Sequence, residues 1–369
     1  MIRLGFFTSP VMLSCNVPDV GIITDHDHVD FRLSTSGSPL LEERYYALDG
    51  MVTVCDLASL IEHYMADSHN VNLAEFTIEA FVGEEEIDHT ELTFTVLYCD
   101  KDLSFSDPTE FLQHNFLTLT PIRRVAPEHY MQVHWYAVDR ESLSFRVYAT
   151  FLDPEGQRGT YQYVHSGNGL LQHGNEVLTE YVYLPTVAEK IKSARKLASV
   201  TLLSVTLRCG ERSLTVHVDP ALTGLPPFSY VNCFNVVEQL AVQGVTTDKL
   251  KVERSLANLG RKSQFYDVST TKEYEVQTAA LTSDECLQIE QMLASPNVRL
   301  PVGAFCECTE TDFEAMQRIL ITDFTCELSD SDEKPNTVKF TWRFEQNRPF
   351  HDYKFPNGTF DNHFNPIFT

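Results

Sequence analysis

Apolar and polar residues alternate along much of this chain. The clearest run is residues 338–344, in which Val338, Phe340, Trp342 and Phe344 share one face. Three shorter segments repeat the pattern: 92–96, 143–147 and 214–218. A period of two is typical of half-buried strands in antiparallel sheets that leave one face in water. We therefore predict a mainly β protein, with two β-sandwich-like domains of antiparallel sheet and a few short amphipathic helices.

Helical spacing is limited to short segments. Residues 56–65 place apolar side chains at i, i+3, i+4 and i+7, and Asp56 can cap the first turn. A second helix is predicted to begin at Thr282, which forms a capping box with Glu285. Residues 186–199 carry an apolar stripe among basic residues, and a helix could form there too.

Charge is distributed unevenly along the 369 residues. The net charge of −24 divides into −19 for residues 1–184 and −5 for residues 185–369. A large difference in net charge between two parts of a chain often marks a domain boundary. We expect an acidic β-rich domain over 1–184, which could divide again near residue 100, and a basic linker over 185–199. A second β-rich domain then follows over 200–348, with an aromatic C-terminal arm over 349–369.

The strongly negative net charge also argues against some classes of function. Neutralising phosphates requires clustered Lys and Arg, so a net −24 argues against nucleic acid and anionic lipid as partners. The sequence contains no run of about 18 apolar residues, so it predicts no membrane-spanning helix. Nine scattered Cys and the absence of an obvious signal peptide favour synthesis in a reducing cytoplasm.

Carboxylates and imidazoles gather between residues 25 and 30. Asp25, His26, Asp27 and His28 could supply oxygen and nitrogen ligands to a divalent cation. In a strand, however, His26 and His28 would share one face and the two Asp the other. We interpret the segment mainly as a solvated loop and expect no metal or other cofactor.

Signatures of catalysis are absent from the sequence. It contains no phosphate-binding loop with Lys, no dinucleotide fingerprint, no G-x-S-x-G and no H-E-x-x-H. We therefore expect no enzymatic activity. A glycan-binding module that uses Trp135, Tyr136 or the Phe-rich C-terminus is an alternative, although sandwich cores also use such aromatic residues. A metal-dependent hydrolase built on the His-rich first half is a second alternative.

The last twenty residues follow neither a helical nor a strand period. An exposed tail this rich in aromatic residues would be sticky in water. It could wrap back over its own domain, or it could pack on a neighbouring subunit. Its candidate interface residues are Phe350, Tyr353, Phe355, Phe360, Phe364 and Phe368.

Several segments resemble structural proteins of phage and prophage tails from gut Bacteroidetes. The resemblance begins at Met1–Val20 and Glu43–Leu57 and continues at the aromatic–Asn–aromatic strand Phe228–Glu238. Where that group usually has Gly, this chain has Asn235, which tolerates the same left-handed backbone angles. Further matching segments keep the same order: 253–255, 274–276, 281–285, 293–298 and 319–323.

The resemblance implies a β-rich component of a tail or baseplate, akin to distal tail proteins, that works as part of a ring. It carries no catalytic residues to this chain. Together with the strand pattern and the aromatic C-terminus, it predicts a non-enzymatic virion protein. The expected partners are other copies of itself and neighbouring virion proteins.

Overall fold

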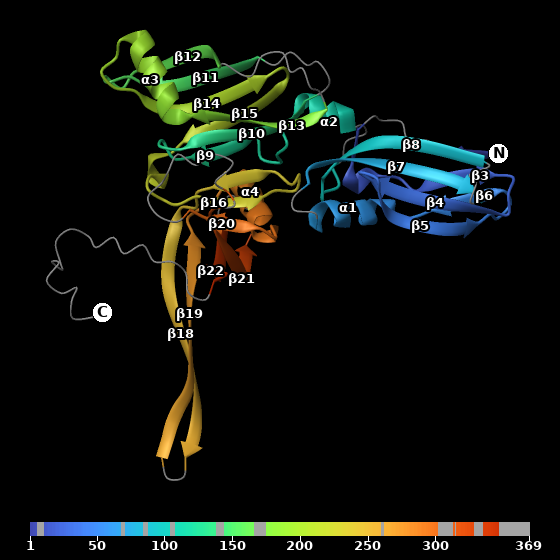
Figure 1. Ribbon diagram of the computed structural model, residues 1–369. Coiled ribbons are helices and arrows are strands. Elements are labelled where there is room, and N and C mark those ends of the chain that lie inside the picture. Colours follow the sequence, from blue (N-terminus) through green and yellow to red (C-terminus); the bar gives the residue numbers. More distant parts are fainter. Residues whose placement is uncertain are drawn as a thin grey trace.

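The computed structural model describes residues 1–5, 11–67, 71–83, 88–103, 108–137, 144–165, 175–259, 262–301, 313, 315–327 and 335–346. These residues form several antiparallel or mixed sheets and a few short helices (Figure 1). The predicted mainly β class is confirmed. Within the described residues, no helix is both long enough and apolar enough to cross a membrane.

The N-terminal unit packs a three-stranded sheet, a five-stranded sheet and one helix around a single core. The strand orders are β1(Ile2–Leu4)-β3(Val20–Thr24)-β6(Met51–Val54) and β2(Val11–Leu13)-β8(Asp88–Leu97)-β7(Leu73–Val82)-β4(His28–Thr35)-β5(Ser38–Tyr46). Alternate residues of β4 are buried, as strand geometry requires. Helix α1(Leu57–Asp67) adds Leu57 and Ile61 to the same core, which confirms the helix predicted there.

The central unit joins a five-stranded sheet to a two-stranded one. The orders are β12(Arg158–His165)-β11(Phe145–Leu152)-β14(Thr201–Cys209)-β15(Arg212–Val218)-β9(Ile122–Val125) and β10(Tyr130–Ala137)-β13(Glu176–Tyr183). Helix α3(Leu184–Arg195) buries Leu184, Val187 and Ile191 in this core, while its basic residues stay outside. The helix predicted over 186–199 therefore exists, and it begins and ends a few residues earlier.

This central unit crosses the predicted domain boundary. β11 pairs with β14 from Arg146↔Arg208 to Leu152↔Thr201, so strands from both sides of residues 185–199 share one sheet. The charge step reflects the composition of the surface, whereas the unit is defined by backbone pairing and burial. Its core lies between residues 116 and 218, and that of the N-terminal unit between residues 2 and 98. The chain thus divides near residue 100 and not at Pro185.

The C-terminal unit is a seven-stranded sheet packed on one helix. Its order is β17(Val237–Leu240)-β16(Phe228–Val231)-β20(Val298–Leu300)-β21(Gln317–Glu327)-β22(Thr337–Phe344)-β19(Lys262–Thr278)-β18(Gly244–Leu259). Alternate residues of β22, from Val338 to Trp342, are buried as predicted. Helix α4(Ser283–Ala294) begins with the predicted capping box between Thr282 and Glu285.

β18 and β19 extend well beyond the rest of this sheet. They pair with each other over their whole length, but β22 pairs only with residues 274–277 of β19. The two strands therefore project from the body as a long ribbon (Figure 1). We call residues 249–259 and 262–273 the arm. At its root, a Cβ on Gly244 would lie 2.4 Å from the carbonyl oxygen of Gln277, so the ribbon requires glycine there.

A shared apolar cluster joins the N-terminal unit to the other two. It combines Leu13 and Leu97 with Phe111 of α2(Pro108–His114) and with Phe234. Asn235 adopts a left-handed backbone, φ 54°, which Asn tolerates better than most residues. Its side-chain amide donates hydrogen bonds to the carbonyl oxygens of residues 65 and 71, at 3.4 and 3.2 Å.

A buried ion pair links the central unit to the C-terminal unit. Arg123 of β9 donates to Glu238 of β17 at 2.6 Å, and both residues are at least nine-tenths buried. Glu238 also accepts hydrogen bonds from the Tyr230 hydroxyl at 2.9 Å and the Asn232 amide at 2.8 Å. Because both carboxylate oxygens of Glu238 have partners, the network favours one arrangement of the two sheets.

Arg124, the next residue of β9, strengthens the same junction. It donates to Glu285 of α4 at 2.8 Å and to Gln243 at 3.2 Å. It also pairs with Asp219 and holds the pKa of that carboxyl below its usual range. Glu285 thus both caps α4 and ties the helix to the central sheet.

We predict that Glu238→Gln lowers the free energy of unfolding by about 3–5 kcal/mol, because it leaves the Arg123 guanidinium buried without a counter-charge. The double substitution Arg123→Met with Glu238→Leu should recover much of this loss. Urea unfolding at pH 7 measures both effects. Glu189→Gln is the control, because it breaks an exposed pair with Lys192 and should cost less than about 1 kcal/mol. Equal losses in the two single variants would contradict the prediction.

Candidate functional site

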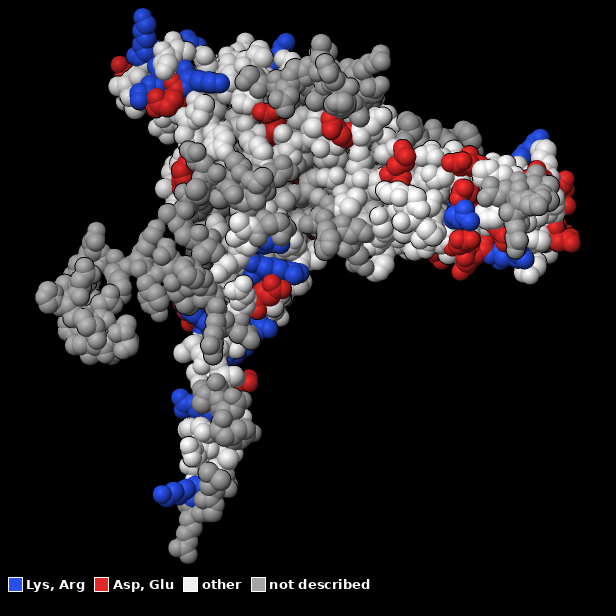
Figure 2. Space-filling view, in the orientation of Figure 1, with Lys and Arg blue, Asp and Glu red and all other residues white. Residues whose placement is uncertain are grey.

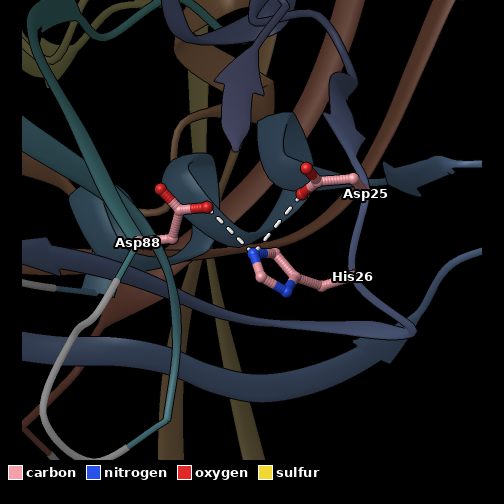
Figure 3. Close-up of side chains that lie close together, drawn as sticks. All are labelled: Asp25, His26 and Asp88. Carbon is pink, nitrogen blue, oxygen red and sulfur yellow. Dashed lines mark hydrogen bonds and ion pairs between the residues drawn. The ribbon is translucent and has the colours of Figure 1, made fainter.

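The structure brings two of the four predicted metal candidates together with a residue that sequence reasoning missed. His26 Nε2 lies 2.9 Å from Asp88 Oδ2 and 3.4 Å from Asp25 Oδ1 (Figure 3). Asp88 belongs to β8, 62 positions further along the chain. Asp27 and His28 are not part of this cluster. No local pattern indicates Asp88, since it reaches His26 only through strand pairing.

The Asp25–His26–Asp88 cluster can hold a positive charge, but it is an open site. The three side chains are exposed or half-buried, and the amino group of Met1 contacts both carboxylates. These contacts with the amino group hold the pKa values of Asp25 and Asp88 below their usual range. One nitrogen and two oxygens would leave a divalent cation to complete its coordination with water. The cluster is therefore a surface charge network with a weak capacity for cations.

Trp135 and Tyr136, proposed for glycan binding, and the nearby His129 and His134 are buried in the described structure. Trp135 and Tyr136 are 3% and 2% exposed, so neither ring presents a face to solvent. His134 bridges two units through Thr179 and the carbonyl oxygen of Val237, both at 2.8 Å. Burial lowers the pKa of His129, which disfavours its charged form. The interface candidates Phe350, Tyr353, Phe355, Phe360, Phe364 and Phe368 lie outside the described residues.

The described cysteines are free thiols, and four of them are buried: Cys99, Cys209, Cys233 and Cys286. Burial raises the pKa of Cys286 to about 11, so its thiol is protonated at neutral pH. A protonated, buried thiol is a poor nucleophile and a poor metal ligand. These cysteines act as small apolar residues of the core.

A cavity of about 240 Å³ lies where the three units meet. Tyr98 and Lys101 line it from the N-terminal unit, Asn232 from the loop after β16, and Glu290 and Gln291 from α4. Gln291 is 6% exposed, and neither atom of its side-chain amide has a hydrogen-bond partner in the described part of the chain. A buried amide without partners destabilises the fold.

The arm has two chemically different faces. Lys249 pairs with Glu275 at 2.5 Å and Lys251 with Glu273 at 2.7 Å, and these four residues line one face. Both lysines are thus neutralised by carboxylates within the same ribbon. Figure 2 shows Lys and Arg spread sparsely along the arm and Asp and Glu gathered at the outer end of the N-terminal unit.

The opposite face of the arm carries large apolar side chains, together with Arg254 and with Lys272, which pairs with Asp248. It exposes four large side chains, whose exposed fractions range from 41% to 66%: Leu250, Val252, Leu256 and Phe265. The positions on β18 alternate with the ion-paired ones, and Phe265 is the cross-strand partner of Leu256. The Arg254 guanidinium stacks on the Phe265 ring, 5.4 Å from its centroid. The side chains of this face therefore remain in contact across the two strands as far as Phe265. We call these four residues the apolar face of the arm.

This apolar face continues the core face of the seven-stranded sheet. At the root of the arm, Tyr274 stacks on Trp342 at 4.2 Å, and Val276 lies two residues further into the core. Within the body the same sheet face packs on Ile289 and Met292 of α4. Beyond Tyr274, no helix or strand of the described chain covers it.

Comparisons with known proteins identify no family. No protein-family model matches the chain, and no curated protein is similar to it. The crystal structure of CBD12 from CALX1.2 aligns with 54% of this chain and 76% of its own, at 11% identity and a TM-score of 0.17. The calcium binding domain CBD12 of CALX1.1 aligns with 54% and 75%, at 10% identity and a TM-score of 0.15. Likenesses at such TM-scores carry no argument about this protein.

We predict that Gln291→Met raises the free energy of unfolding by about 1–2 kcal/mol, because it removes a buried amide that lacks partners and keeps a similar volume. Thermal denaturation of the purified protein measures the change. Gln288→Met on the same helix is the control: Gln288 donates to the carbonyl oxygen of Gln239 at 3.3 Å, so its loss should destabilise. Destabilisation by Gln291→Met would show that the amide is paired in solution.

Proposed function

We propose that this protein is a non-enzymatic structural component of a phage virion, in the tail or baseplate, that assembles with other copies of itself and with neighbouring virion proteins. The observation that carries the proposal is the arm, which projects from the body and exposes an apolar face. The segments resembling phage tail proteins support the virion as the setting.

The arm is built for contact with another molecule. A two-stranded ribbon without further packing is only marginally stable in water. Full burial of a Leu, Val or Phe side chain stabilises by about 1.5–3 kcal/mol relative to full exposure. A partner that covers Leu250, Leu256 and Phe265 would therefore bind tightly and would order the ribbon. The ion pairs on the opposite face keep that face soluble.

A second apolar surface lies on the N-terminal unit, far from the arm in sequence. Ile23 and Met51 are cross-strand partners, and Leu48 bridges to Met51. Their exposed fractions are 59%, 56% and 78%. Two unlike apolar surfaces on one chain favour heterologous contacts, in which one surface of each copy binds a different surface of the next. Contacts of this kind form a ring when the rotation between successive copies closes, and a filament when it does not.

The alternative functions lack comparable support. The rings assigned to a glycan-binding face at Trp135 and Tyr136 are buried. The predicted metal site retains Asp25 and His26 but gains only one further ligand, Asp88, in an open position. Neither arrangement forms a site as developed as the arm.

We predict that the purified protein forms larger species as its concentration rises, and that Leu250→Ser, Leu256→Ser and Phe265→Ser together abolish them. The triple variant should keep the thermal midpoint of the body, since these side chains lie outside the clusters that form its core. Light scattering coupled to size exclusion, with negative-stain images, measures both outcomes.

The matched control is Lys251→Ser with Glu273→Ser, which changes the other face of the same ribbon and should leave assembly intact. A wild-type protein that stays monomeric at all concentrations, alone and with tail proteins, would disprove the proposed function.

A further inference from the structure

The three-stranded sheet of the N-terminal unit presents a row of large apolar side chains on its outer face. Ile23 of β3 is the cross-strand partner of Met51 of β6, and Met51 bridges to Leu48. Cross-strand partners lie on the same face of a sheet. The adjoining residues Ile22 and Val52 point the other way and are buried in the core. We call Ile23, Leu48 and Met51 the N-terminal row; all three are more than half exposed.

The N-terminal row lies open in the described structure. Gly21 is the preceding residue of β3 on the same face, and a Cβ placed on it would meet no atom within 4 Å. An open sheet face that groups large apolar side chains is typical of a contact surface. Since sheets pack face to face through interdigitating side chains, another sheet or a ribbon is suited to cover it.

The apolar face of the arm is a surface of the matching kind. Its large side chains lie along a two-stranded ribbon, in which Leu256 and Phe265 are cross-strand partners. The two strands of a ribbon lie about 5 Å apart, and the outer strands of a three-stranded sheet about 10 Å apart. The arm therefore fits within the width of the N-terminal sheet.

An acidic turn lies at one end of the N-terminal row. Asp49 and Gly50 form the tight turn that leads into β6, with φ of 51° and 77°. Asp49 is exposed, and no ion pair within the described ranges involves it. At the other end of the row, the cross-strand partner of Ile23 is Arg3. The row is therefore acidic at one end and basic at the other.

Arg254 supplies a positive charge on the apolar face of the arm. Its guanidinium stacks on the Phe265 ring, and among the described residues no carboxylate pairs with it. Lys272, on the same face, is already paired with Asp248. Arg254 is thus the cation of this face that is available to a partner.

The charges of the two surfaces are complementary. Residues 1–98 carry 3 basic and 17 acidic side chains, a net −14, whereas the arm carries 5 basic and 3 acidic side chains, a net +2. Figure 2 shows Asp and Glu gathered at the outer end of the N-terminal unit, where Figure 1 places β3 and β6. Docking with Arg254 against Asp49 is attractive, whereas the reverse direction would set Arg254 against Arg3.

The two surfaces of one copy do not meet. Figure 1 shows the arm projecting from the C-terminal unit, away from the N-terminal unit, and β3 and β6 lie at the far end of that unit. The units are joined by the apolar cluster around Phe234 and by the buried pair of Arg123 and Glu238. An N-terminal row that an arm covers therefore belongs to another copy.

We propose that the apolar face of the arm of one copy packs on the N-terminal row of the next copy, with Arg254 paired to Asp49 across the contact. This inference rests on the proposed function, and it names the surface that the arm binds. Each copy uses its arm once and its row once, so the contact is heterologous and can propagate from copy to copy.

The test reverses the charge at each end of the proposed ion pair. Arg254→Glu places a carboxylate against Asp49, and Asp49→Arg places a guanidinium against Arg254. Like charges across a contact are strongly unfavourable, so we expect each single variant to raise the dissociation constant of self-assembly roughly a hundredfold. Light scattering coupled to size exclusion, over a range of concentrations, measures it.

Restoration of assembly is the decisive result. The double variant Arg254→Glu with Asp49→Arg should assemble again, because the pair is present with its charges exchanged. An equal mixture of the two single variants should assemble as well, since the arm of each then meets a row of opposite charge on the other. Recovery in the mixture arises only from a contact between copies.

Matched changes elsewhere serve as controls. Lys251→Glu with Glu273→Lys reverses an ion pair on the other face of the arm, and Glu75→Arg repeats the charge change of Asp49→Arg on the outer face of the five-stranded sheet. Both should assemble like the wild type, and thermal midpoints show whether each variant is folded. If Asp49→Arg does not fold, Asp49→Asn replaces it, because Asn tolerates the left-handed turn. In that background, Arg254→Glu should weaken assembly far less than it does in the wild type.

Two results overturn the inference: an Arg254→Glu variant that assembles like the wild type, or single variants that fail without recovery in the double variant and the mixture. In both cases the variant with Leu250→Ser, Leu256→Ser and Phe265→Ser still reports on the proposed function. Loss of its assembly would keep the arm as the interface and assign it a different partner surface. A wild-type protein that stays monomeric would remove the proposed function, and this inference with it.

Discussion

The pairing of Arg123 with Glu238 determines how the larger part of this molecule is arranged. The guanidinium lies between the five-stranded and seven-stranded sheets, where an unpaired charge would be strongly unfavourable. Tyr230 and Asn232 complete the coordination of the carboxylate. Such a network tolerates little displacement, so the position of β9 determines that of β17 and of the strands beyond it.

The direction of the arm depends on the junction between the five-stranded and seven-stranded sheets. Because β18 and β19 are the last two strands of the seven-stranded sheet, the direction of the ribbon follows from the placement of the sheet. Arg124 adds a second constraint, since it holds Glu285 at the start of α4, and α4 covers the sheet face from which the apolar face of the arm continues. These contacts hold the seven-stranded sheet in place, and the arm projects from it with an apolar face that no described helix or strand covers.

Charge has a local role in this protein. Lys249 and Lys251 are paired across the ribbon with Glu275 and Glu273. The acidic side chains remain concentrated on the outer N-terminal unit (Figure 2). Exposed charges of this kind influence solubility and the orientation of approaching partners more than the fold itself.

The sequence alone determined features that depend on neighbouring residues. The alternation over 338–344 and the capping box of Thr282 and Glu285 both follow from local geometry, and the structure contains both. Only the tertiary structure decided which strands pair. It placed β11 beside β14 across the predicted boundary, brought Asp88 to His26 and buried Trp135. Along the arm it left β18 and β19 with only each other as partners among the described strands. These outcomes depend on contacts between residues distant in sequence, and a pattern of period two states that a strand has an apolar face without stating what covers it.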